Sequence, residues 1–196
     1  LVEDFTRTTD VMETPGWRYV GAPSETDVVA VVESGDVMLL RYQTSPRHFL
    51  GQVTRISLGS PVHVRGDVGD GLVALADGSG TVRLFESSNL TSRAERKLAA
   101  GIANDVFVAG GAVYVETGEG ELLCLKPEEG LPTAWSLPLE GSHLAGRPLV
   151  TETGAVVPLQ DGRVLVVDGS GQVQKTITTG EGLSGGPCAA GRDVLA

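Results

Sequence analysis

A Gly-x-Pro pattern recurs along the chain at intervals of about 40 residues or twice that length. The four copies are Gly21-Ala22-Pro23, Gly59-Ser60-Pro61, Gly146-Arg147-Pro148 and Gly185-Gly186-Pro187. The first two copies begin 38 residues apart and the last two begin 39 apart. The middle interval of 87 residues contains Ala103-Asn104-Asp105, where a degenerate copy is expected. The chain is therefore an array of one repeated supersecondary unit.

Each repeat contains two apolar runs separated by a turn that holds a glycine. In the first repeat, Val28–Val32 and Val37–Tyr42 flank such a turn, and in the fourth the turn is Asp161-Gly162. Asp-Gly between apolar runs is a strong signal for a β-hairpin. The runs are almost continuously apolar, as in strands that are covered on both faces. Together with the period, this predicts an all-β, WD40-like propeller of four-stranded antiparallel blades.

The repeats divide the chain into one propeller region over residues 1–196. We expect a partial blade at 1–20, four blades at 21–58, 59–100, 101–141 and 142–182, and a second partial blade at 183–196. Trp17–Val20 is assigned to the end of a preceding repeat, and each Gly-x-Pro to the start of an innermost strand. Two hypotheses remain open. The chain is an excerpt of a larger propeller, or Leu1–Phe5 pairs with the strand of Val194 and Leu195 in a closed ring of five blades.

Charge narrows the classes of partner. Asp and Glu total 25 against 15 Lys and Arg, which gives a formal net charge of −10 and a pI near 4.7. Nucleic-acid binding relies on a basic surface, and docking on anionic lipid does as well. No apolar run approaches the roughly 20 residues of a membrane span. A protein partner is the remaining expectation, with no nucleic acid and no membrane span.

The third and fourth repeats resemble the repeats of pyrroloquinoline-quinone-like propellers. They read VYVETGEGELLCLKPEEGLPTAWSLPLEG and GRPLVTETGAVVPLQDGRVLVVDGSGQVQKTITTG. In that family a strand ends in Asp, a Thr-Gly turn follows, and a Trp docks between blades. Asp168 matches the Asp, and Gly130 and Trp135 match the turn and the docking Trp, whereas Lys126 replaces the Asp in the third repeat. The resemblance implies a structural role in blade docking for Trp135, Gly130 and Asp168.

The resemblance favours the non-enzymatic branch of this quinoprotein-type family. The family's enzymes bind the quinone over a disulfide of adjacent cysteines, with Glu, Asn and Asp on a calcium ion. Here Cys124 and Cys188 are 64 residues apart, so no cofactor or metal residue carries over and no cofactor is expected. The non-enzymatic relatives include a scaffold lipoprotein of outer-membrane protein assembly, which favours an exported or periplasmic location.

The resulting functional hypothesis is a non-catalytic binding or scaffold module that contacts a protein through one loop face. The alternative is part of a divergent quinoprotein dehydrogenase or glycan-active enzyme whose catalytic residues lie outside this segment. His48, His63 and His143 belong to different repeats and indicate no shared site. Arg65-Gly66-Asp67 spells an adhesion tripeptide, which we interpret as a chance occurrence.

Acidic residues recur in the turns between the second and third strands of each repeat. In a propeller these turns emerge on one face, so their charges would form an arc that steers a basic partner. The alternative is ordinary turn chemistry, because Asp and Glu are common in solvated turns. The candidate partner-binding residues are Glu33, Asp36, Asp77, Glu119, Glu121 and Asp161.

Overall fold

The computed structural model describes residues 17–32, 35–44, 48–59, 66–190 and 193–195, and every regular element in them is a β-strand. In these residues no helix is long and apolar enough to cross a membrane. The predicted strand at Leu1–Phe5, and with it the ring-closing pairing, lies outside the described residues.

Sixteen strands form four antiparallel four-stranded sheets, each made of consecutive strands. The first sheet contains β1 (Trp17–Gly21), β2 (Asp27–Val32), β3 (Asp36–Gln43) and β4 (Phe49–Ser57). The second contains β5 (Asp67–Gly69), β6 (Leu72–Ala76), β7 (Thr81–Glu86) and β8 (Ser92–Lys97). The third contains β9 (Ile102–Ala109), β10 (Ala112–Thr117), β11 (Glu121–Leu125) and β12 (Thr133–Pro138). The fourth contains β13 (Leu149–Thr151), β14 (Gly154–Pro158), β15 (Arg163–Asp168) and β16 (Val173–Thr178), and a hairpin of β17 (Cys188–Ala190) and β18 (Asp193–Leu195) follows.

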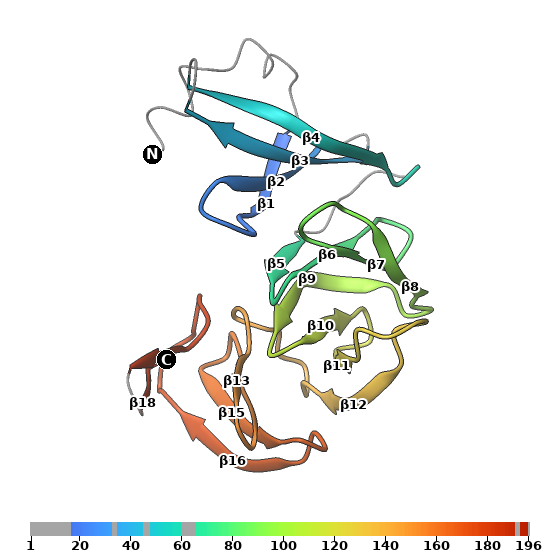
Figure 1. Ribbon diagram of the computed structural model, residues 1–196. Helices are drawn as coiled ribbons and strands as arrows, with labels where there is room; N and C mark the ends of the chain where they lie inside the picture. The colour runs from blue at the N-terminus through green and yellow to red at the C-terminus, as the bar shows by residue number, and fades with distance from the viewer. Residues whose placement is uncertain (1–16, 33–34, 45–47, 60–65, 191–192, 196) are drawn as a thin grey trace.

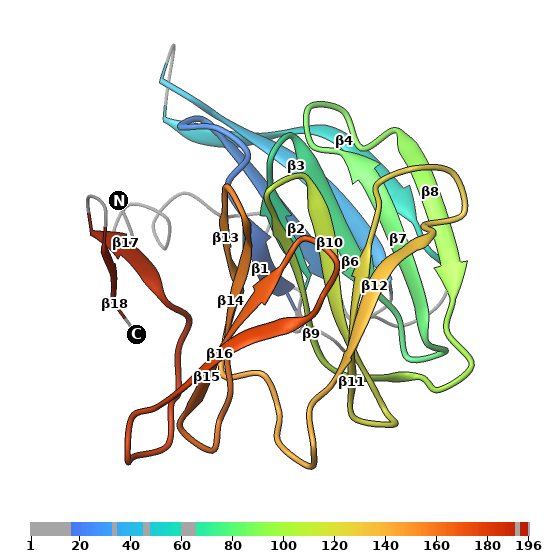
Figure 2. The ribbon, with the colours of Figure 1, turned by 90° about the horizontal axis from the view of Figure 1, so that it is seen from below.

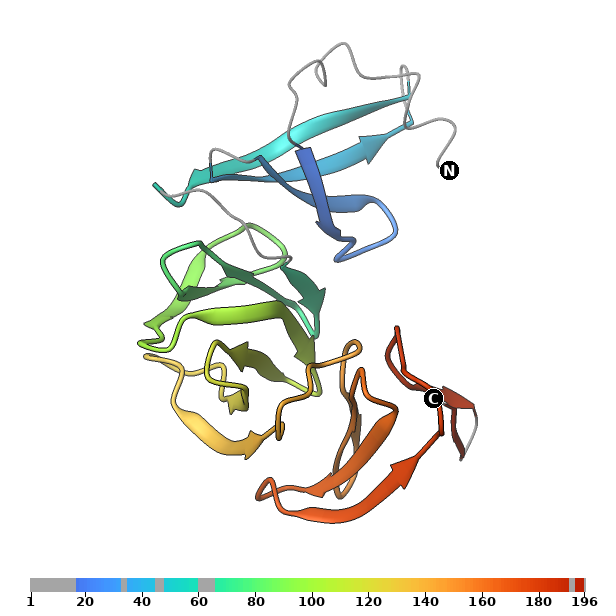
Figure 3. The same cartoon turned by 180° about the vertical axis from the view of Figure 1, so that it is seen from behind.

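The sheets follow one another along an arc and radiate from a common centre (Figure 1). The first strands β5, β9 and β13 lie nearest this centre, and β8, β12 and β16 lie farthest from it. Seen from behind, the same order is evident, with the β17–β18 hairpin after the fourth sheet (Figure 3). This is the arrangement of propeller blades, and it confirms the predicted all-β fold.

The middle strands of the sheets are buried on both faces. In the third sheet, Val113 and Val115 pack with second-sheet residues, whereas Tyr114 and Cys124 pack with fourth-sheet residues. Because successive side chains on a strand point to opposite faces, a strand between two sheets needs apolar residues at every position. This accounts for the continuous apolar runs in the sequence.

The same glycine turn, closed by the same backbone hydrogen bond, occurs in all four sheets. The glycine that precedes the third strand has a positive φ, from 76° at Gly120 to 92° at Gly35. Its carbonyl accepts the N–H of the residue that follows the fourth strand: Leu58 on Gly35, Leu98 on Gly80, Leu139 on Gly120 and Thr179 on Gly162. Glycine is favoured here because its missing Cβ removes the penalty for positive φ.

The first Gly-x-Pro has a different structural cause from the third and fourth copies, and the strand start predicted at Pro61 of the second copy lies outside the described residues. Trp17–Gly21 is the first strand of the first sheet and pairs with β2, so its assignment to a preceding repeat is wrong. Gly21 ends this strand, and a Cβ on it would lie 2.6 Å from Cβ of Val68. By contrast, Gly146 and Gly186 precede β13 and β17 as predicted, and a Cβ on Gly146 would lie 2.4 Å from the Gly186 nitrogen.

Candidate functional site

The predicted acidic turns carry less free charge than the sequence suggests. Arg55 donates to the Asp36 carboxylate, and Arg163 Nε lies 2.7 Å from Asp161 Oδ2. Glu119 is exposed and Glu121 is half-buried, while Glu33 lies outside the described residues. The turns recur as predicted, but three of the six carboxylates, those of Asp36, Asp77 and Asp161, are each paired with an arginine of their own sheet.

Asp77 departs most from the expected exposed turn residue. It is 2% exposed, and its Oδ1 accepts the N–H groups of Ser79 and Thr81 and the Ser79 hydroxyl. Its Oδ2 lies 2.6 Å from Arg83 NH1. The carboxylate therefore holds the β6–β7 turn together from inside, and the expectation that it is solvent-exposed is wrong.

The residues of the predicted docking motif lie in two places. Trp135 on β12 is 9% exposed, meets Tyr114 edge to face at 5.9 Å, and packs over Gly171 of the fourth sheet. Asp168 closes the turn that contains Gly171: its Oδ1 accepts the N–H groups of Ser170 and Gln172. The Ser170 hydroxyl also donates to this carboxylate and, with those N–H groups, lowers its pKa. Gly130 is an exposed turn residue with φ of 74°, away from the Trp135–Gly171 contact.

A buried carboxylate that the sequence did not single out joins the third and fourth sheets. Glu116, at 0% exposure, accepts the Leu144 N–H at 3.0 Å and the Asn104 side-chain amide at 3.3 Å. Nδ1 of His143 lies 2.5 Å from its other oxygen. His143, which lies in a loop, therefore takes part in the contact with Glu116 that anchors the segment before β13.

Three sheets meet at Asp67, near the centre of the arc. Its Oδ2 accepts the Val108 N–H at 2.8 Å, and its Oδ1 accepts from the Arg147 guanidinium. Asp67 is 8% exposed, so it is occupied by structural contacts, in agreement with the interpretation of Arg65-Gly66-Asp67 as chance. Arg65 lies outside the described residues. The bonds tie β5 and β9 to the residue two positions before β13.

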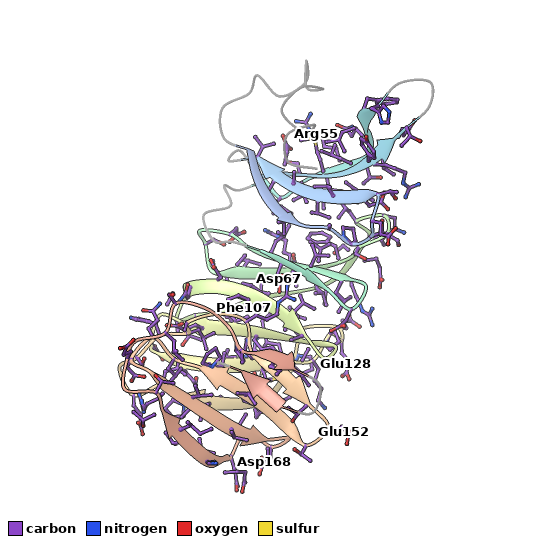
Figure 4. The ribbon with its side chains drawn as sticks, turned by 90° about the vertical axis from the view of Figure 1, so that its left-hand side faces the viewer. Arg55, Asp67, Phe107, Glu128, Glu152 and Asp168 are labelled. Carbon is purple, nitrogen blue, oxygen red and sulfur yellow. The ribbon has the colours of Figure 1, made fainter. Side chains whose placement is uncertain are left out.

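Beside Asp67, a cleft of about 520 Å³ opens between the second, third and fourth sheets. Val108, Ala109, Pro148, Leu149 and Val150 provide its apolar lining, and Asp70, Arg147 and Glu152 its charges. Figure 4 looks onto these strands from the centre of the arc, with Asp67, Phe107 and Glu152 labelled.

Close packing of neighbouring turns shapes the cleft. The Gly111 N–H donates to Asp70 Oδ2 at 2.9 Å, which joins the β5–β6 and β9–β10 turns. A Cβ on Gly69 would lie 2.9 Å from the Val108 carbonyl oxygen, and a Cβ on Gly110 would lie 2.5 Å from a Val150 methyl group. Glycine at these positions lets each turn lie directly on the next first strand.

The cleft lies at the end of the sheets opposite the predicted acidic turns. Successive turns of an antiparallel meander alternate between the two ends, so the first-to-second turns face away from the second-to-third turns. Gly69-Asp70-Gly71 has the residue types of an ordinary tight turn, so its sequence does not mark it as part of a cleft. The available signal was the valine that recurs at 68, 108 and 150, just before each of these turns.

Comparison with known proteins identifies the fold. No protein-family model matches the chain, and no curated protein sequence matches it. BamB from Moraxella catarrhalis has a TM-score of 0.69 and 17% identity, covering 90% of this chain and 53% of that chain. Apo AztD from Citrobacter koseri has a TM-score of 0.61 and 16% identity, with coverage of 86% and 48%.

BBS1N, solved in complex with ARL6DN, has a TM-score of 0.59 and 18% identity, with coverage of 86% and 55%. This chain therefore spans about half the length of the solved structures it matches. At these identities the likeness shows the fold alone: the chain is a β-propeller arc of four-stranded blades.

Proposed function

We propose that the chain is a non-catalytic binding module of the pyrroloquinoline-quinone-like propeller type. It binds a segment of a partner protein at the cleft between the second, third and fourth sheets, which we name the axial cleft. The observation that carries the proposal is the cleft itself. Its volume of about 520 Å³ lies within the roughly 300–1,000 Å³ of typical ligand sites, and its lining combines apolar walls with a few polar groups. A β-propeller neighbour, BBS1N, was solved with a protein partner, ARL6DN, which supports this kind of function.

The charges in the cleft favour a basic segment. Arg147 is bound to Asp67, so its positive charge is largely balanced. Asp70 receives only a backbone N–H, and Glu152 makes no ion pair among the described residues. Two carboxylates thus remain for a lysine or arginine of the partner, while Leu149 and Val150, which are both half-buried, contact its aliphatic parts. Complementary charge of this kind mainly accelerates association.

The test begins with peptides selected from a random dodecapeptide display library on the wild-type chain. Their binding is measured by fluorescence anisotropy at several salt concentrations. Glu152→Gln should weaken binding about two- to fivefold at low salt, as expected for one exposed ion pair, and should flatten the salt dependence.

The matched control is Glu119→Gln, which removes an exposed carboxylate at the opposite end of the sheets. This variant should leave the affinity unchanged. If Glu119→Gln weakens binding and Glu152→Gln does not, the predicted acidic turns form the binding face and the cleft proposal is wrong.

A further inference from the structure

The first sheet has a strand extension that the other sheets lack. β3 and β4 contain 8 and 9 residues, whereas the third and fourth strands of the other sheets contain 5 or 6. β2 begins with Asp27 opposite Arg41, so the pairs Tyr42–Leu50 and Gln43–Phe49 lie beyond the start of β2. Figure 2 shows β3 and β4 extending past the β13–β14 turn on the upper side. We name residues 42–43 and 48–50 the aromatic extension.

The aromatic side chains of this extension are held in place. The Tyr42 hydroxyl lies 2.6 Å from His48 Nδ1, and the two ring centroids are 5.8 Å apart. The Phe49 ring lies over Gly51, where a Cβ would be 3.2 Å from Cε2 of the ring. Rings fixed in this way lose little conformational entropy when a partner covers them.

The second and third sheets use the same connection in the opposite way. Leu90 and Leu131, in the third-to-fourth turns of the second and third sheets, have positive φ and are at most 2% exposed. Their turns fold an apolar side chain into the core. In the first sheet Phe49 is 36% exposed and His48 is exposed as well. His48 and Phe49 therefore do not fill the core as those two leucines do.

The charged residues at this end of the sheets indicate which class of partner could bind the aromatic extension. Third-to-fourth connections emerge at the same end as the first-to-second turns, where the cleft opens. Figure 4 shows Glu128 and Glu152 on this same side, and the whole chain has a net charge of −10. Beside the extension, Arg41 is balanced by Asp27. The acidic excess of the chain disfavours anionic lipid and nucleic acid, which leaves a basic protein segment as the complementary occupant.

We propose that the aromatic extension is an interaction surface that binds arginine and aliphatic side chains of a basic protein segment. Arginine stacks on the faces of Tyr and Phe rings, and exposed aromatic anchors commonly dominate protein interfaces. This inference rests on the proposed function, because the same segment occupies the axial cleft. The extension contributes affinity that depends little on salt, in contrast to the cleft carboxylates.

The experiment uses the same selected dodecapeptides and the full chain. Phe49→Ala and Tyr42→Phe each change the extension, and the second removes only the hydroxyl that His48 contacts. The matched control is Val53→Ala, which truncates another exposed apolar residue of β4. Thermal unfolding followed by circular dichroism establishes that each variant is folded. Phe49→Ala should weaken binding at least fivefold at every salt concentration, Tyr42→Phe should have a smaller effect, and Val53→Ala should have none.

The outcomes separate the two proposals. If Glu152→Gln weakens binding and Phe49→Ala does not, the cleft binds the peptide and the inference about the extension is wrong. If neither variant changes binding, both proposals are wrong. Phosphatidylglycerol vesicles provide the other arm: co-sedimentation of the wild-type chain that Phe49→Ala abolishes would make the extension a lipid anchor and overturn the inference.

Discussion

Two aspartates at related turn positions of the repeat have opposite environments. Asp77 is 2% exposed and receives four hydrogen bonds from its own turn and from Arg83. Asp161 is exposed and bonds mainly with Arg163, which itself contacts Glu140. The sequence assigns them one role because both begin turns after apolar strands. Burial, which depends on neighbouring strands, decides which of them supports the fold.

Replacement of Asp77 by Asn should therefore reduce stability. The amide places N–H donors where the carboxylate accepts from other donors, and it leaves Arg83 without its buried counter-charge. We expect the free energy of unfolding to fall by about 1–3 kcal/mol in urea denaturation. Asp161→Asn should change it by less than about 1 kcal/mol, since that ion pair is at the surface. Equal effects of the two changes would show that Asp77 is as solvated as Asp161.

Asp27 makes the free energy of unfolding depend on pH in the acid range. Arg41 donates two hydrogen bonds to its carboxylate, at 2.7 and 3.0 Å, and these hold the pKa of Asp27 below its ordinary value of 3.8. The unfolded chain then binds the proton more readily than the folded chain. The stabilisation is present above about pH 4 and is lost as the pH falls through the lowered pKa. Asp27→Asn should make the decline of stability between about pH 5 and pH 3 shallower, as measured by urea unfolding. An unchanged slope would contradict this linkage.

At the scale of elements, the hairpins could be predicted from adjacent residues, whereas the contacts between segments far apart in the sequence could not. The glycines before each third strand were found because a turn with positive φ depends on adjacent residues. Trp17–Gly21 was misassigned for a different reason: a short strand in front of a Gly-x-Pro looks in sequence like the end of a preceding repeat, whereas this strand pairs with β2. Glu116 was missed because its partners Asn104, His143 and Leu144 come from other segments.

The contact between Trp135 and Gly171 can be tested as a pair. Trp135→Ala should lower the free energy of unfolding by about 3–5 kcal/mol, as for other buried aromatic truncations. Gly171→Ala should also destabilise, because φ is 82° and the new Cβ would lie 2.8 Å from the Trp135 ring. In the Trp135→Ala background the clash with the ring is gone, and only the contact with Cβ of residue 135 and the cost of positive φ remain. The double variant should therefore lose less than the sum of the two.

Gly130→Ala is the matched control for this pair, since it has φ of 74° and no atom within 4 Å of the added Cβ. It should cost about 1–2 kcal/mol, the backbone penalty alone. Additive effects of Trp135→Ala and Gly171→Ala in urea denaturation would mean that the tryptophan does not press on the fourth sheet.

At the scale of the whole molecule, stability comes from contacts between neighbouring sheets. Each internal interface buries one apolar cluster, from Val29 and Val73 at the first to Trp135 and Val167 at the third. The period of the sequence predicts this order because each repeat must cover the next. The cleft was not predictable in the same way. It depends on how closely Gly69 and Gly110 let successive turns approach, and this distance is a property of three sheets together.

Such an array should open from its ends. The second and third sheets are covered on both faces by other sheets, whereas the β17–β18 hairpin has two strands and β16 is exposed along its whole length. Amides of β6, β7, β10 and β11 should therefore exchange slowest in native-state hydrogen exchange, and those of β17 and β18 fastest. Pairing of Leu1–Phe5 with Asp193–Leu195, the closed-ring hypothesis, would instead give Val194 the protection of an internal strand. Exchange at Val194 as slow as at Val115 would support that ring and contradict opening from the β17–β18 end, whereas fast exchange at Val194 would exclude the pairing.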